Sequence, residues 1–134
     1  MNATIADYMA TELVSLDPGD DIVEAVRVLL ERDLSGAPVV DSRGQLVGIL
    51  SQKDCFEIVY RTAYHQDWGG QVQQYMSRDP EHLEAGCSVV EAADRFLHSN
   101  FRRYPVLRDG ELVGLIGRRD ILRALDQLYL HPSG

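Results

Sequence analysis

Apolar residues recur along the chain in the order of a short strand, a helix, two strands and a second helix. The first helix begins at Asp20 or Asp21 as N-cap, and its inward stripe has helical spacing: Ile22, Ala25, Val26, Leu29 and Leu30. A short strand at 13–16 precedes it, after a helical turn for which Thr4 is the candidate N-cap. Beyond the helix, the pattern predicts a strand at 37–40, a turn at 41–44, a return strand at 45–50 and a helix over 51–64.

The same order recurs in the second half of the chain, 67 residues later and then 66 residues later after a one-residue deletion. Tyr75 and Met76 thus repeat Tyr8 and Met9. The pattern predicts strands at 82–84, 104–107 and 111–116, a turn at 109–110, and helices from Ser88 and from 117 to about 130. The inward positions of the helix that begins at Ser88 are Val89, Ala92, Ala93, Phe96 and Leu97. We therefore predict a first repeat at 5–64, a linker at 65–71 and a second repeat at 72–130.

Each repeat has the order β-α-β-β-α, which predicts an α/β fold of the α+β type. A repeat of about 60 residues buries too little surface to be stable alone, so the two are expected to pack as one domain. A pseudo-two-fold arrangement of the repeats predicts two equivalent clefts between them. Trp68 in the linker is expected to lie against other residues.

The net charge of −8 argues against tight binding to nucleic acid or to an anionic membrane, because both need a basic surface. The charge is uneven: residues 1–67 hold 5 Lys and Arg against 12 Asp and Glu, whereas Arg95 to Arg123 holds 7 basic residues against 3 acidic ones. No apolar run reaches the ~18 residues of a membrane span, and no signal-peptide pattern begins the chain. We expect a cytoplasmic protein with a local cationic patch.

The residue patterns of enzymes and metal sites are missing from the sequence. Cys55 and Cys87 lie far apart without a CxxC spacing, and the four histidines show no HxH or HxxxH spacing. There is no GxSxG motif and no Walker A loop. We therefore expect neither catalysis nor a bound metal.

Ser51 and Asp54 follow a predicted strand and begin a predicted helix, and two interpretations of them are open. In the first, they form a local cap that satisfies otherwise unpaired backbone N–H groups. In the second, the Asp54 carboxylate also accepts hydrogen bonds from both hydroxyls of a ribose, which favours a nucleoside over a bare phosphate. Asp120 holds the equivalent position in the second repeat.

Four arginines flank the last predicted hairpin, as Arg102 and Arg103 before it and Arg118 and Arg119 after it. Arginine binds phosphate oxygens bidentately. Solvated loops are the alternative explanation, but cations in the first turn of a helix face the positive end of its dipole and are unfavourable without an anion. Tyr104 is the candidate to stack on a base or to bond a phosphate.

The duplicated pattern resembles a pair of cystathionine-β-synthase (CBS) domains, the tandem called a Bateman module. The resemblance rests on an extended hydrophobic-Pro-Val segment in each repeat and on a Gly-hydrophobic-hydrophobic-Ser/Thr-x-x-Asp pattern at 48–54, which recurs at 114–120 with Gly117 in place of Ser or Thr. It covers about residues 5–125 and implies a stand-alone CBS-domain protein. In this family, the clefts between repeats bind adenosine-containing ligands, and two discs commonly associate as a homodimer.

The resemblance implies a ribose on Asp54, helped by the Ser51 hydroxyl, and a weaker or empty cleft at Asp120, because Gly117 lacks that hydroxyl. It implies adenine near His82 and Leu83 and phosphates near the arginines. The full candidate nucleotide-binding set is Ser51, Lys53, Asp54, Ala37, His82, Leu83, Arg102, Arg103, Tyr104, Arg118 and Asp120.

The function implied is a regulatory module that binds an adenosine-containing ligand and signals to an unknown partner protein. The ligand stays open among AMP, ADP, ATP, a dinucleotide and S-adenosylmethionine, none of them an obligatory cofactor. The alternative is a ligand-free dimerisation or scaffold protein with the same fold.

Overall fold

The computed structural model describes residues 3–66 and 69–132 and contains two compact units. The first-repeat unit is Val14–Pro80, and the second-repeat unit combines the described parts of Met1–Leu13 and Glu81–Gly134. Trp68, predicted to lie against other residues, falls outside the described residues. Each unit has its own core of buried apolar side chains.

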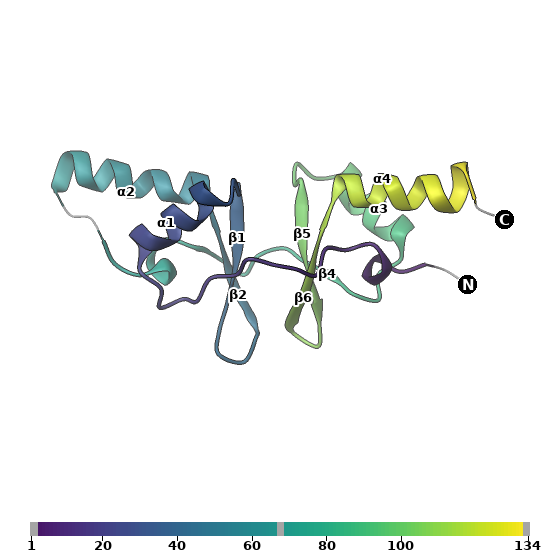
Figure 1. The fold of residues 1–134 in the computed structure, drawn as a ribbon, viewed down its shortest axis with the longest axis horizontal. Coiled ribbons are helices and arrows are strands. Elements are labelled where there is room, and N and C mark those ends of the chain that lie inside the picture. The colour runs from purple at the N-terminus through teal and green to yellow at the C-terminus, as the bar shows by residue number, and fades with distance from the viewer. Residues whose placement is uncertain (1–2, 67–68, 133–134) are drawn as a thin grey trace. The chain divides into compact units, whose positions relative to one another are not determined.

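The first-repeat unit is an antiparallel sheet with two helices on one side of it (Figure 1). Its elements are α1 (Ile22–Glu31), β1 (Gly36–Val40), β2 (Leu46–Ser51), α2 (Gln52–His65), the 3-10 helix η2 (Val72–Gln74) and β3 (Ser77–Arg78). The strand order is β1-β2-β3. Asp21 is the N-cap of α1, where its carboxylate accepts a hydrogen bond from the Glu24 N–H at 3.1 Å.

The second-repeat unit repeats this plan. Its elements are the 3-10 helix η1 (Ile5–Asp7), β4 (Leu83–Glu84), α3 (Val89–Leu97), β5 (Arg103–Arg108), β6 (Glu111–Gly117), α4 (Arg118–Leu125) and the π-helix η3 (Asp126–Leu130). β4 runs parallel to β5, and β5 pairs antiparallel with β6. Both hairpins shift register at equivalent places, after Val39 and after Val106. The prediction of a mixed α and β fold built from two like repeats is confirmed.

The segment that begins each sequence repeat packs in the unit formed mainly by the other repeat. Ile5 is fully buried in the core of the second-repeat unit, where its N–H donates to the Cys87 carbonyl at 2.9 Å. The equivalent Val72 is fully buried in the first-repeat unit and donates to the Asp20 carbonyl at 2.9 Å. The two units are therefore built by the same exchange of short segments.

Glycines at equivalent positions of β2 and β6 let a methionine approach each sheet closely. A Cβ on Gly48 would lie 2.6 Å from Met76 Sδ and 2.8 Å from the Ser77 carbonyl oxygen. A Cβ on Gly114 would lie 2.9 Å from the Ala10 carbonyl oxygen and would also meet Met9. The repeated Tyr-Met pairs thus belong to the packing of the sheets.

Three sequence predictions need correction. Of the strand predicted at 13–16, Leu16 alone makes a bridge, to Val39, because the chain turns away at 17–20. Leu30 and Leu97, predicted to face inward, are 69% and 79% exposed. Thr4 does precede η1, but its side chain makes no capping hydrogen bond.

Candidate functional site

The Ser51–Asp54 junction lies where β2 runs directly into α2. The Asp54 N–H donates to Ser51 Oγ at 3.1 Å, and the Ser51 N–H donates to Asp54 Oδ2 at 2.9 Å. This reciprocal pair is a capping box, which satisfies two N–H groups that the helix itself leaves unpaired. The structure therefore contains the local helix cap that the first interpretation of these residues predicts.

The second oxygen of Asp54 is held more loosely. Asp54 Oδ1 accepts a bond from the Ser77 hydroxyl at 3.4 Å, a long distance for an O–H···O bond. A carboxylate has about four acceptor positions on its two oxygens. The partly exposed Asp54 side chain therefore keeps acceptor capacity beyond its capping role.

The Gly117–Asp120 junction, between β6 and α4, repeats half of this arrangement. The Gly117 N–H donates to Asp120 Oδ2 at 2.8 Å, but Gly117 has no hydroxyl to accept a bond in return. Asp120 Oδ1 lies 3.4 Å from a guanidinium nitrogen of Arg123. In both carboxylates, Oδ2 thus accepts from a backbone N–H, whereas Oδ1 contacts the Ser77 hydroxyl in Asp54 and the Arg123 guanidinium in Asp120.

The arginines gather where the β5–β6 hairpin meets the start of α4. Arg103 pairs with Gly117 across the hairpin, and the backbone N–H of Arg118 donates to the Arg102 carbonyl at 3.1 Å. Arg118 also donates through Nε to the Phe101 carbonyl at 3.1 Å. Within residues 3–66 and 69–132, no carboxylate lies within ion-pair distance of Arg102, Arg103, Arg118 or Arg119, and all four side chains are exposed. This arginine cluster can receive an anion.

Tyr104 is a core residue, which corrects its prediction as a stacking or phosphate-binding side chain. It is 1% exposed, and its hydroxyl donates to Ser99 Oγ at 2.8 Å. Its ring packs edge-on against Phe96 with ring centroids 4.9 Å apart, and the Arg95 guanidinium lies 5.2 Å from its centroid. The ring has no open face for a base.

The other predicted positions vary in exposure. Ala37 and Leu83 are buried in strands β1 and β4, so they offer backbone rather than side chain to a ligand. Lys53 is exposed in the first turn of α2. His82 is partly buried, and its Nε2 lies 3.4 Å from the Glu84 carboxylate.

Two residues of these junctions were missed by sequence reasoning. Ser77 lies 23 residues from Asp54, and a hydroxyl on the strand β3 gives no recognisable local pattern. Arg123 follows Asp120 by three residues, and that helical spacing does predict an ion pair.

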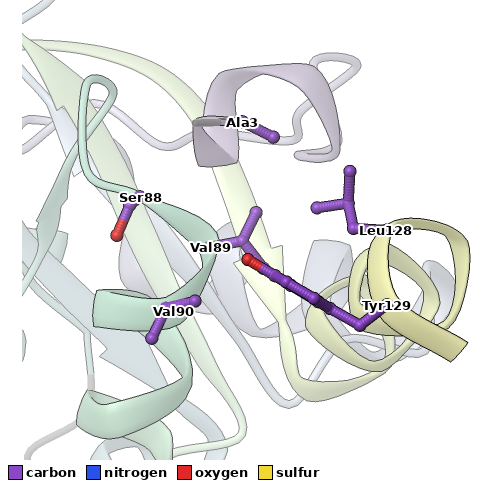
Figure 2. A pocket seen from close by; sticks show the side chains of 6 residues that line it. All are labelled: Ala3, Ser88, Val89, Val90, Leu128 and Tyr129. Atoms are coloured by element: carbon purple, nitrogen blue, oxygen red, sulfur yellow. The ribbon is translucent and has the colours of Figure 1, made fainter. Parts of the chain in front are cut away.

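The second-repeat unit also contains a pocket, which none of the predicted nucleotide-binding residues lines. Figure 2 shows its lining, drawn from the N-terminal segment, the start of α3 and η3: Ala3, Ser88, Val89, Val90, Leu128 and Tyr129. The pocket is thus separate from both strand-to-helix junctions. It offers mostly apolar side chains beside two hydroxyls.

Both thiols are poor nucleophiles. Burial raises the pKa of Cys55, and the adjacent Asp54 carboxylate raises it further. Burial and Glu91 raise the pKa of Cys87, against a smaller opposite effect of Arg95. Both therefore stay protonated at neutral pH.

In the described part of the chain, no three His, Cys, Asp or Glu side chains form a cluster suited to a metal, and no helix is long and apolar enough to cross a membrane.

Solved structures with the same fold include a CBS-pair protein. The crystal structure of CBSX2 in complex with AMP is 29% identical, with a TM-score of 0.79, over 92% of this chain and 96% of that one. A crystal structure of CBSX2 from Arabidopsis thaliana is 26% identical, with a TM-score of 0.78, over 95% of this chain and 96% of that one.

Among curated proteins, an uncharacterised 17.7 kDa protein of Acidianus ambivalens is 29% identical over 100% of this chain and 80% of its own length. An A-adding tRNA nucleotidyltransferase of Aquifex aeolicus is 30% identical over 92% of this chain but only 14% of its own length. This chain thus corresponds to a small part of that enzyme. The profile of the CBS domain matches twice, at residues 5–61 and 72–127. The chain therefore belongs to the CBS domain family, as a tandem pair of CBS domains.

Proposed function

We propose that this chain is a regulatory module that binds an adenosine-containing ligand, with the ribose hydroxyls on Asp54. The observation that carries the proposal is the remaining acceptor capacity of Asp54 Oδ1, whose Ser77 contact is long at 3.4 Å. A ribose hydroxyl can add to that contact or replace it without breaking the capping box. The AMP in the similar CBSX2 structure supports this class of ligand.

We propose separately that the arginine cluster, which lies in the second-repeat unit, binds anionic groups such as phosphates. Its exposed guanidinium groups lack a carboxylate partner within the described residues, so an anion gains charge-assisted hydrogen bonds there without breaking an ion pair. AMP, ADP and ATP all present such an anion. S-Adenosylmethionine has a single carboxylate beside a sulfonium and an ammonium group, so it would gain less from this cluster than a phosphate does.

A regulatory output requires that the ligand bind one conformation of the chain better than another. We propose that a separate partner protein binds the ligand-bound and ligand-free conformations with different affinity.

Binding is tested by thermal unfolding of the purified chain with adenosine, AMP, ADP, ATP and S-adenosylmethionine, and with GMP and GTP as controls. A ligand at 100 times its Kd stabilises the native state by about 2.7 kcal/mol, which raises Tm by several degrees. We expect a shift with adenosine compounds and none with the guanosine controls. A cooperative melt that no ligand shifts would instead support the ligand-free scaffold.

Asp54→Ala tests the ribose assignment by isothermal titration calorimetry. Each hydrogen bond to a charged group contributes about 1.5–3 kcal/mol, so the loss is expected to weaken adenosine binding at least about tenfold. The substitution also removes half of a capping box. Asp21→Ala is the matched control, because it removes the N-cap of α1 and should cost similar stability while preserving the Kd. Equal Kd values for Asp54→Ala and wild type would contradict the assignment.

We also propose that the chain forms a homodimer through the exposed face of α2. This face carries Phe56, Val59, Tyr60 and Tyr64, which are 58–74% exposed. A second copy presents the same apolar face, so the two faces can bury each other in a two-fold contact.

A further inference from the structure

Arg123 distinguishes the two equivalent junctions. It lies one helical turn after Asp120, and the same guanidinium nitrogen is 3.4 Å from Asp120 Oδ1 and 3.2 Å from the Tyr8 carbonyl oxygen. Arg123 therefore bridges α4 to the segment that follows η1. With the Gly117 N–H on Oδ2, both oxygens of Asp120 have a donor.

The first-repeat unit carries the opposite charge at this position. Glu57 is the equivalent of Arg123 at the 66-residue offset, and it pairs with Arg61 at 3.4 Å. A carboxylate at this position repels Asp54 and cannot occupy its Oδ1. The partner that Asp54 Oδ1 has instead is the neutral Ser77 hydroxyl at 3.4 Å.

We propose that Arg123 weakens ribose binding at the Asp120 carboxylate, so that the chain binds its first nucleoside at Asp54. This inference rests on the proposed function. A ribose at Asp120 has to compete for Oδ1 with a cationic donor that is also anchored on the Tyr8 carbonyl. The Asp120 side chain is three-quarters buried, so little of the carboxylate is left open to a ligand, and the Arg123 guanidinium lies 3.4 Å from its Oδ1.

The expected size of the effect follows from exposure. Ion pairs this exposed contribute at most about 1 kcal/mol, which limits the effect on second-site affinity to several-fold. Removal of the Arg123 guanidinium should therefore tighten the second site several-fold, while the first site is unaffected. Lys in its place keeps the charge but cannot bridge two acceptors with a planar fork.

The test uses adenosine as the probe, because an uncharged ligand does not respond directly to a change of charge. Calorimetry of the full chain is expected to give one equivalent bound to wild type at ligand concentrations up to a few times the Kd. Arg123→Gln should tighten a second site about two- to fivefold and leave the first Kd unchanged. Arg123→Lys should fall between wild type and Arg123→Gln.

The reciprocal substitution places an arginine at the equivalent position of the first junction. Glu57→Arg places a guanidinium three residues after Asp54 and should weaken adenosine binding there several-fold. Glu57→Gln is its control, because it removes the Glu57–Arg61 pair without adding a cation. The inference is supported if Arg123→Gln strengthens the second site and Glu57→Arg weakens the first.

Two failures are distinguishable. If wild type binds adenosine through Asp54 but Arg123→Gln does not tighten a second site and Glu57→Arg binds as Glu57→Gln does, the role of Arg123 is wrong and the proposed function stands. If wild type and every variant bind no adenosine, the proposed function is wrong, and the inference is wrong with it.

Discussion

At the scale of single residues, the strand-to-helix junctions show what a short motif can predict. Ser51 and Asp54 have the spacing of a capping box, and the structure contains it. The absence of a hydroxyl at Gly117 is equally visible in the sequence. By contrast, the burial of Tyr104 could not be inferred from its arginine neighbours, because it depends on contacts with α3. Ser77 was hidden for a similar reason, since its partner is distant in the sequence.

Gly117→Ser is expected to complete the second capping box. Gly117 has extended φ and ψ angles of −112° and 169°, close to the −102° and 163° of Ser51, and a Cβ there would lie 3.5 Å from its nearest neighbours. Urea unfolding should show stabilisation by a few tenths of a kcal/mol. Gly117→Ala is the control and should be less stable than Gly117→Ser by about 1 kcal/mol. Equal stability of the two variants would show that the hydroxyl makes no cap.

At the scale of elements, apolar periodicity predicts the amphipathic helices α1 and α3, but it includes one residue too many in the buried face of each. Leu30 and Leu97 each lie eight positions after the first inward residue, Ile22 or Val89, so they sit about 80° around the helix from it. At the C-terminal end of α1 and α3 that direction leads away from the sheet. The error occurs at equivalent positions, because the two helices have the same geometry.

The exchange of short segments was beyond sequence reasoning for a different reason. Ile5 and Val72 stand at equivalent positions of the two repeats, and their local sequences predict the same helical turn. Which core each one enters is decided by tertiary packing, which no local pattern records. The resulting units therefore combine residues that are distant along the chain.

Ile5→Ala is expected to weaken the core of the second-repeat unit, although residue 5 begins the first sequence repeat. Truncation of a fully buried isoleucine costs about 2–5 kcal/mol. Hydrogen exchange should show faster amide exchange in β5 and β6, with a smaller change in β1 and β2. Val72→Ala is the matched variant and should show the reverse. Loss of protection confined to β1 and β2 in Ile5→Ala would contradict the packing described for η1.

At the scale of the whole molecule, duplication repeats exposed positions as well as buried ones. Phe56 and Leu122 are equivalent and 68% and 66% exposed, and Tyr64 and Leu130 are equivalent and 74% and 69% exposed. Monomeric proteins rarely leave large contiguous apolar surfaces uncovered. The sequence predicts these helices, and the resemblance implies a homodimer. The exposure of these apolar side chains is known only from the structure, because apolar periodicity does not distinguish a side chain buried in the core from one that contacts a second chain.

Phe56→Glu is expected to shift the chain from dimer to monomer. A carboxylate within a self-complementary apolar face would be buried without a partner, and the two-fold relation places it in the contact twice. Sedimentation equilibrium over a range of concentrations should show at least a tenfold weaker dimer. Ser42→Glu is the control, because it adds the same charge at an exposed position of the turn between β1 and β2. A monomeric wild type, or a dimer equally strong in Phe56→Glu and Ser42→Glu, would show that α2 does not form the contact.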